Sequence, residues 1–178
     1  MKGNDGSGNI EERDEWQTPQ KLWDKLDYQY NFKLDCCANY NNRKCKLWWN
    51  DFGSLESYEQ PFLNKMVCWM NPPFSKANEM FEHFFKIVKS GVAIYRCDNM
   101  ETKLWQDIIL KNANWVFIPK GRISYEGMEG KGSRFPSALI GFNVDIPKGL
   151  DGTILYTEKI KTYNPELMKK LIKVSTEV

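Results

Sequence analysis

Residues 66–79 read MVCWMNPPFSKANE, and this stretch decides the fold class of the chain. Its first five residues are apolar, which is typical of a strand that is buried on both faces of a sheet. From Ser75 onward the residues predict a helix, with Ser75 as its N-cap. A buried strand that leads through a short proline-rich loop into a helix indicates an α/β sheet, in which ligand sites lie at the carboxyl ends of the strands.

The loop between strand and helix has the composition of a site that methylates an exocyclic amine. Such a nitrogen is a weak nucleophile, because its lone pair is delocalised into the ring. An asparagine side-chain oxygen and a prolyl carbonyl can each accept one amino hydrogen and so localise the lone pair, while the prolines stiffen the loop. An aromatic ring adds a face on which an extruded base can stack. The catalytic candidates are Asn71, Pro72, Pro73 and Phe74, called the tetrad below, although the same residues also suit an ordinary turn.

The rest of the chain alternates between strand-like and helix-like segments without an internal repeat. This alternation predicts a mostly parallel sheet that is covered by helices and finished by antiparallel strands. Pro19 is expected at the first helical position, and residues 137–142 are expected in a β-hairpin at the sheet edge. The expected helices cover residues 19 to about 27, 75–89, 101–110 and 165–173, and the expected strands cover residues 32–38, 66–70, 92–95, 115–118 and 137–142.

The composition is that of one soluble globular domain, with 178 residues of which 42% are hydrophobic and 27% charged. Residues 1–13 are polar and lack a hydrophobic signal core, so we expect a disordered arm there and a single domain over residues 14–178. The sequence contains no apolar run of about 18 residues, so a membrane span is not expected. Nothing in the sequence determines the oligomeric state, and a monomer is our expectation.

The five cysteines are an odd number, with no CxxC pair among them, and His83 is the only histidine. This pattern favours buried reduced thiols in a cytoplasmic protein over zinc ligands or disulfides, so no metal site is expected. A catalytic triad built on histidine is not expected either, because His83 lies in the middle of a predicted helix.

Charged residues at two kinds of position suggest ligand contacts. Asp35 ends the first strand and Asp51 follows in a turn, where carboxylates can bind ribose hydroxyls or amines, although aspartate is also common there as a turn former. Residues 111–148 contain six lysines and arginines against three acidic residues, which could meet phosphate or form an ordinary solvated surface.

Six motifs, in this order, resemble those of the phage-type DNA N6-adenine methyltransferases, small enzymes often carried by bacteriophages and prophages. No single motif is specific, but the ordered set covers roughly residues 14 to 142. The motifs are DEWQTP at residues 14–19, LDCCAN at 34–39, DFGSL at 51–55, NPPFS at 71–75, IPKGRI at 118–123 and GSRFPS at 132–137.

The resemblance implies an α/β, Rossmann-like methyltransferase fold with a mostly parallel seven-stranded sheet and a C-terminal antiparallel hairpin. It implies S-adenosylmethionine as the methyl donor and N6 of adenine in DNA as the acceptor. It also implies that the protein is located in the cytoplasm, which is that of a bacterial host if the gene belongs to a phage. By analogy, Trp16, Thr18, Pro19, Asp35, Ala38 and Asp51 would bind the donor, and Arg122 and Arg134 would face the DNA. The chain departs from common patterns in two ways, because its first loop lacks a glycine-rich turn and its tetrad ends in Phe where Tyr is frequent.

Other functions remain open from the sequence. The same kind of tetrad serves enzymes that methylate guanine amines in RNA or glutamine side chains in proteins, but those enzymes usually carry a glycine-rich first loop and lack a WQTP segment. A non-catalytic nucleic-acid-binding relic of the fold is a further alternative, which the intact tetrad disfavours. A purely structural protein fits the motifs least well.

Overall fold

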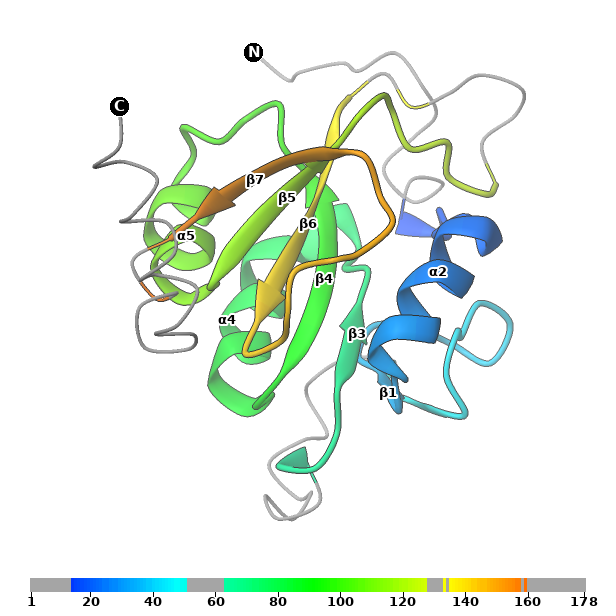
Figure 1. Ribbon diagram of the computed structural model, residues 1–178. Helices are drawn as coiled ribbons and strands as arrows, with labels where there is room; N and C mark the ends of the chain where they lie inside the picture. The colour runs from blue at the N-terminus through cyan, green and yellow to red at the C-terminus, as the bar shows by residue number, and fades with distance from the viewer. Residues whose placement is uncertain (1–13, 51–62, 128–132, 134, 158, 160–178) are drawn as a thin grey trace.

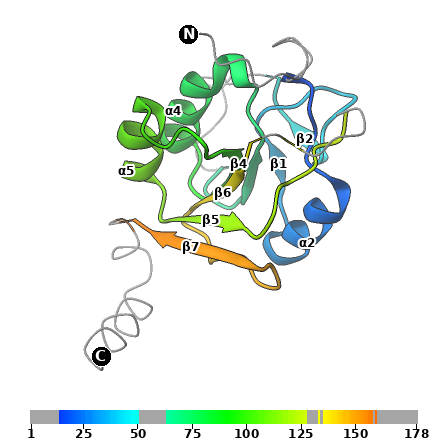
Figure 2. The same ribbon diagram turned by 90° about the horizontal axis from the view of Figure 1, so that it is seen from above.

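The computed structural model describes residues 14–50, 63–127, 133, 135–157 and 159. These residues form a seven-stranded sheet, with α2 on one face and α4, η3 and α5 on the other (Figures 1 and 2). In the order β2-β1-β3-β4-β6-β5-β7, the strands are Leu47–Trp48, Leu34–Asp35, Cys68–Met70, Gly91–Arg96, Ser137–Phe142, Trp115–Pro119 and Gly152–Tyr156. The helical elements are α2 (Gln20–Tyr30), the 3-10 helix η2 (Phe74–Lys76), α4 (Ala77–Ile87), the π-helix η3 (Leu104–Ile109) and α5 (Leu110–Asn112).

The expected number of seven strands is confirmed, but the expected mostly parallel pairing is wrong. Strands β2, β1, β3 and β4 pair in parallel, whereas β4 with β6, β6 with β5, and β5 with β7 pair antiparallel. The sheet is therefore mixed, with three parallel and three antiparallel pairings. The parallel half contains the strand that leads into the tetrad.

Strand β6, which covers residues 137–142, is not at the sheet edge as expected, because it lies between β4 and β5. Its sequence SALIGF is a continuous small and apolar run with five buried residues, as suits a strand that is covered on both faces. Strand β7 forms the edge instead, and its residues are exposed or half-buried.

Both faces of the sheet bury an apolar cluster, and the side chains of each strand alternate between the two. In β4, Ala93 and Tyr95 join α4 and η3 in the first cluster, whereas Val92 and Ile94 join α2 in the second. In β3, Cys68 and Met70 belong to the first cluster and Trp69 to the second. This alternation explains why the central strands read as unbroken apolar runs.

Several element boundaries differ from those expected. Helix α2 runs three residues beyond Asp27, with Pro19 at its N-cap position, and the strand predicted over residues 32–38 is reduced to Leu34–Asp35. Residues 101–110 form only a π-helical turn from Leu104 that continues into α5. The arm of residues 1–13 and the helix of residues 165–173 lie outside the described residues.

The parallel pairing brings the carboxyl ends of three strands to one edge of the sheet. Asp35 ends β1, Asn71 follows β3, and Arg96 ends β4. Polar groups that are far apart in the sequence therefore gather where an α/β sheet builds its ligand site. None of the described helices is long and apolar enough to cross a membrane.

Candidate active site

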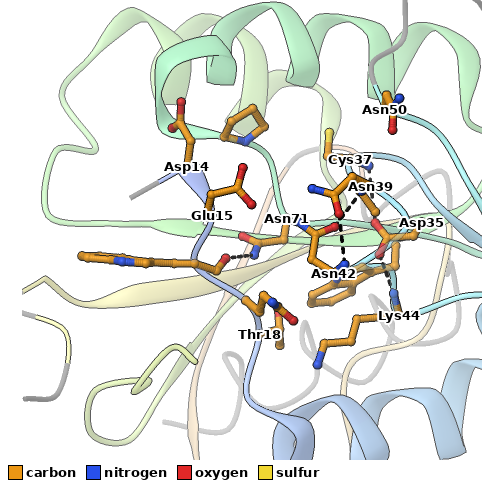
Figure 3. Close-up of a pocket in the computed structure, with 15 residues that line it drawn as sticks. Asp14, Glu15, Thr18, Asp35, Cys37, Asn39, Asn42, Lys44, Asn50 and Asn71 are labelled. Atoms are coloured by element: carbon orange, nitrogen blue, oxygen red, sulfur yellow. Dashed lines mark hydrogen bonds between the residues drawn. The ribbon is translucent and has the colours of Figure 1, made fainter. Parts of the chain in front are cut away.

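A cavity of about 240 Å³ lies at the carboxyl edge of the sheet (Figure 3). Three segments line it, namely residues 14–18, residues within 35–50 and residues within 69–73. The cavity thus joins the segment before α2, the loop between β1 and β2, and the tetrad loop. It is lined by Asn71 and Pro73 of the expected catalytic residues and by Trp16, Thr18, Asp35 and Ala38 of the expected donor-binding residues.

The side-chain amide of Asn71 has a defined orientation. Its Nδ2 donates a hydrogen bond to the backbone carbonyl of Trp16, with an N–O distance of 2.9 Å (Figure 3). A carbonyl oxygen only accepts, so the nitrogen must face Trp16 and the Oδ1 atom must point elsewhere. Among the described residues, no hydrogen bond to Oδ1 is formed, which leaves this oxygen as an acceptor at the cavity wall.

The segment before α2 is tied to the loops on both sides of it. The carboxylate of Asp14 accepts hydrogen bonds from the backbone N–H of Ser75, at 3.1 Å, and from its hydroxyl. Ser75 therefore lies inside η2 and binds Asp14, and the expected N-cap role of its side chain is wrong. Gln17 and Glu126 exchange two backbone hydrogen bonds of 3.0 and 2.9 Å. One short segment thus connects the tetrad loop to the loop that follows β5.

Phe74 lies in an aromatic cluster beside the cavity and does not line it. Its ring centroid is 6.1 Å from that of Trp16, 5.8 Å from that of Tyr95 and 5.5 Å from that of Phe135. Phe74 is half-buried, whereas the other three rings are buried. The last residue of the tetrad is therefore oriented by rings from three other parts of the chain.

The carboxylate of Asp35 is buried at the floor of the site, with 3% of the residue exposed. Burial raises its pKa from 3.8 to about 6, against the backbone hydrogen bonds from Lys44 and Cys37, which lower it. The donor–acceptor distances are 3.0 Å from Lys44 and 3.4 Å from Cys37. The two bonds order the loop between β1 and β2, and the raised pKa marks an acidic group that a cationic or hydroxyl-bearing ligand would help to ionise.

The cavity also contains a buried hydroxyl that has no partner. Thr18 is 1% exposed, and its Oγ1 makes no hydrogen bond within the described structure. A buried polar atom without a partner is costly, and one that faces a cavity is suited to bind a ligand. The Nζ atom of Lys44 lies 3.0 Å from Oε1 of Gln20 and 3.6 Å from a carboxylate oxygen of Glu126. The donor set of the site thus offers a hydroxyl, carboxylates and an ammonium group, which fits a ligand that carries both charges and hydroxyls.

The remaining expected site residues are not seen in the cavity lining, or they lie outside the described residues. Pro72 is buried and Pro19 caps α2, and neither lines the cavity. Arg122 is exposed, and its Nη1 donates to the backbone carbonyl of Ser133 over 3.2 Å. Asp51 and Arg134 lie outside the described residues.

Sequence reasoning overlooked several polar residues of the cavity. Asn42 and Lys44 line it from the loop between β1 and β2, which the sequence left without an assigned structure, and Asn50 lines it from just after β2. A signal was present, because residues 36–50 contain four asparagines and three basic residues but no acidic residue. Such a polar stretch directly after a first strand is a reasonable place to look for ligand contacts.

A comparison with protein families matches residues 7–138 of the chain to a family described as DNA N-6-adenine-methyltransferase (Dam). The matched region includes all three segments that line the cavity. Among curated proteins, no match to the chain was found.

Proposed function

Because the chain belongs to the DNA N-6-adenine-methyltransferase (Dam) family, which confirms the resemblance of its motifs, we propose that it transfers a methyl group from S-adenosylmethionine to N6 of adenine in DNA. The observation that carries the proposal is the orientation of Asn71 at the cavity wall. The family match supports adenine in DNA over an amine of RNA or a glutamine side chain, and the intact tetrad supports an active enzyme over a relic.

The chain's residues act by orienting the amine. With its Nδ2 bound to Trp16, Asn71 presents Oδ1 to one amino hydrogen of the adenine, and the carbonyl of Pro72 accepts the other. The nitrogen lone pair is then directed out of the ring plane and toward the methyl donor. A strong base is unnecessary, because the alkylated amine is acidic and loses its proton to water. Phe74 provides the aromatic surface against which the extruded base stacks.

S-adenosylmethionine supplies an electrophilic methyl group on a positively charged sulfur. The buried hydroxyl of Thr18 and the carboxylate of Asp35 are suited to hold its polar groups. Trp16 and Ala38 add apolar surface to the wall, and the ammonium group of Lys44 can attract the carboxylate of the methionine part. Pro19 and Asp51 are proposed to complete this site as the family resemblance implies.

The DNA contacts are proposed at two arginines, of which Arg122 is exposed in the described structure. Arg122 lies on the loop after β5, which Gln17 and Glu126 connect to the segment beside the tetrad. Arg134 follows in the same part of the sequence and is proposed as a second contact. We further propose that residues 14–178 act as one domain, as a monomer, in the bacterial cytoplasm where DNA is accessible.

The experiment that tests the proposal offers three acceptors to one enzyme. Purified protein is incubated with S-adenosylmethionine that carries an isotopic methyl label, together with DNA, RNA or a protein extract. We expect the label in DNA, as N6-methyladenine after digestion and mass spectrometry. Label in RNA or protein with none in DNA would contradict the proposed acceptor, and no label in any fraction would contradict the proposed activity.

A further inference from the structure

Arg96 ends β4, beside the strand that leads into the tetrad. Its Nε and Nη2 atoms donate to the two carboxylate oxygens of Asp98, over 2.7 and 2.6 Å. Two parallel bonds of this kind fix the plane of the guanidinium group, which a single contact would not do. The side chains are 21% and 32% exposed, so the pair is partly shielded from water.

The fixed guanidinium group lies over an aromatic ring of the site. Its Cζ atom is 4.9 Å from the ring centroid of Phe135, which is 2% exposed. The ring of Phe135 in turn meets Phe74 edge to face, with centroids 5.5 Å apart and an interplanar angle of 76°. Two contacts therefore connect the ion pair to the aromatic residue of the tetrad, and both depend on ring orientation.

The backbone holds both ends of this connection in place. The carbonyl of Arg96 accepts a hydrogen bond from Nε1 of Trp105 over 3.1 Å, and Trp105 lies in the π-helix η3. The N–H of Cys97 donates to the carbonyl of Pro136 over 2.9 Å, directly after Phe135. Arg96 and the ring of Phe135 thus lie on two adjacent, paired segments. The ion pair with Asp98 further restrains the side chain of Arg96.

Neighbouring positive groups favour the ionised form of Asp98. The hydrogen bonds from Arg96 hold the pKa of Asp98 below its usual value, and the charge of Arg122 lowers it further. Arg122, proposed above to contact DNA, is therefore close enough to act on Asp98.

We propose that Arg96 and Asp98 are positioning residues for the target base. Asp98 orients the guanidinium group of Arg96, Arg96 holds the ring of Phe135, and Phe135 holds Phe74 at the angle at which an extruded adenine stacks. This inference rests on the proposed function and names residues that act on the base through other side chains. The competing role is purely structural, in which the pair only stabilises the turn after β4.

The test combines Arg96→Gln, Asp98→Asn and the double variant with Arg96→Lys as the conservative change. The control is Asp107→Asn, which breaks the exposed ion pair of Asp107 with Lys111, whose charged atoms are 2.8 Å apart. Methyl transfer is measured on a single-stranded oligonucleotide, and base stacking is followed by the fluorescence of 2-aminopurine placed at its adenine positions. Binding of S-adenosylmethionine is measured by calorimetry.

We expect either single change to lower kcat about tenfold and to reduce the fluorescence change, with donor affinity altered less than about twofold. The double variant should be no worse than the singles, because each change already breaks the same unit. Arg96→Lys should recover part of kcat, because it keeps a cation over Phe135, and the control should match the parent.

Three results would overturn the inference. The first is an unchanged kcat and fluorescence in variants that only melt at a lower temperature, which would show a purely structural role. The second is a fold-decrease of kcat in the double variant that equals the product of the decreases in the two single variants, which would show that the two residues act separately. A parent that transfers no methyl group to DNA would overturn the proposed function and the inference with it, whereas the first two results leave the proposed function intact.

Discussion

At the scale of single residues, chemical roles in this protein depend on partners that are distant in the sequence. Asn71 would be an asparagine of undefined orientation without the carbonyl of Trp16, which lies 55 positions earlier. Asp35 would titrate as an ordinary carboxyl group without the burial that raises its pKa to about 6. The identity of a residue therefore determines which chemical groups it offers, and its contacts determine the orientation and the pKa of those groups.

Removal of the Thr18 hydroxyl should change the affinity for the methyl donor and the free energy of unfolding in different ways. Thr18→Val keeps the shape of the side chain and removes an oxygen that has no partner in the described structure. We expect donor affinity to fall roughly three- to tenfold, and the free energy of unfolding without donor to stay equal or rise, because an unsatisfied buried group is removed. Calorimetry and urea unfolding measure the two quantities. Unchanged affinity with a clear loss of stability would make the hydroxyl a structural group.

Asp35 makes stability depend on pH. Its pKa is raised on folding, from 3.8 to about 6, so the folded chain binds its proton more tightly than the unfolded chain. The associated stability is fully present below pH 3.8 and is lost as the pH rises through 6. Between pH 4.5 and 6.5 this group should lower the free energy of unfolding by about 2 kcal/mol.

Asp35→Asn should remove that contribution, since an amide does not titrate. Urea unfolding of the parent and the variant at both pH values isolates it, because all other titrating groups are shared. The same pH dependence in both proteins would show that Asp35 ionises normally in the folded state.

At the scale of secondary-structure elements, the sheet explains which sequence patterns could be interpreted and which could not. The alternation of apolar segments predicted α2, β1, β3, α4, β4 and β5, although β1 is shorter than expected and β2 was not predicted. The place of β6 was predicted wrongly, since a local pattern does not state which strands a segment pairs with. Its continuous apolar run was nevertheless a signal for an interior position, because an edge strand such as β7 exposes part of its residues.

The interior position of β6 makes Gly141 sensitive to substitution. A Cβ atom added there would overlap the indole of Trp115, which is fully buried and donates through Nε1 to the carbonyl of Val144 over 2.8 Å. We expect Gly141→Ala to lower the free energy of unfolding by about 1–3 kcal/mol, as overpacking of a core does. Leu155→Ala on the edge strand β7 is the comparison and should cost less, because Leu155 is 39% exposed. Equal losses at the two sites would contradict the interior placement of β6.

At the scale of the whole molecule, the site is assembled from segments that only the fold brings together. Of the residues that line the cavity, the motifs of the sequence pointed to Asn71, Pro73, Asp35 and Thr18, all of which belong to local patterns at strand ends or before a helix. The sequence could not predict that residues 14–18 fold back over the tetrad loop, because this depends on the bonds of Asp14 to Ser75 and of Trp16 to Asn71. The contact of Arg96 with the ring of Phe135 was missed for the same reason.

The overall charge is close to balanced, at +2, so DNA binding must rest on particular residues. Arg122→Ala should lower the slope of log affinity against log salt by about one unit, if Arg122 contacts one phosphate. Lys111→Ala is the control, since Lys111 is 65% exposed and paired with Asp107. An unchanged slope with slightly reduced thermal stability would assign Arg122 to its hydrogen bond with Ser133 alone.

Asn71 is proposed to orient the adenine amine, and a comparison of two asparagine variants tests this role. Methyl transfer to DNA is measured for Asn71→Ala and for Asn78→Ala, an exposed asparagine on α4 that serves as the matched control. We expect Asn71→Ala to fold, to bind S-adenosylmethionine as the parent does, and to lose about 10²-fold or more in kcat, while Asn78→Ala stays active. Near-parental turnover in a folded, donor-binding Asn71→Ala variant would show that Asn71 does not orient the amine.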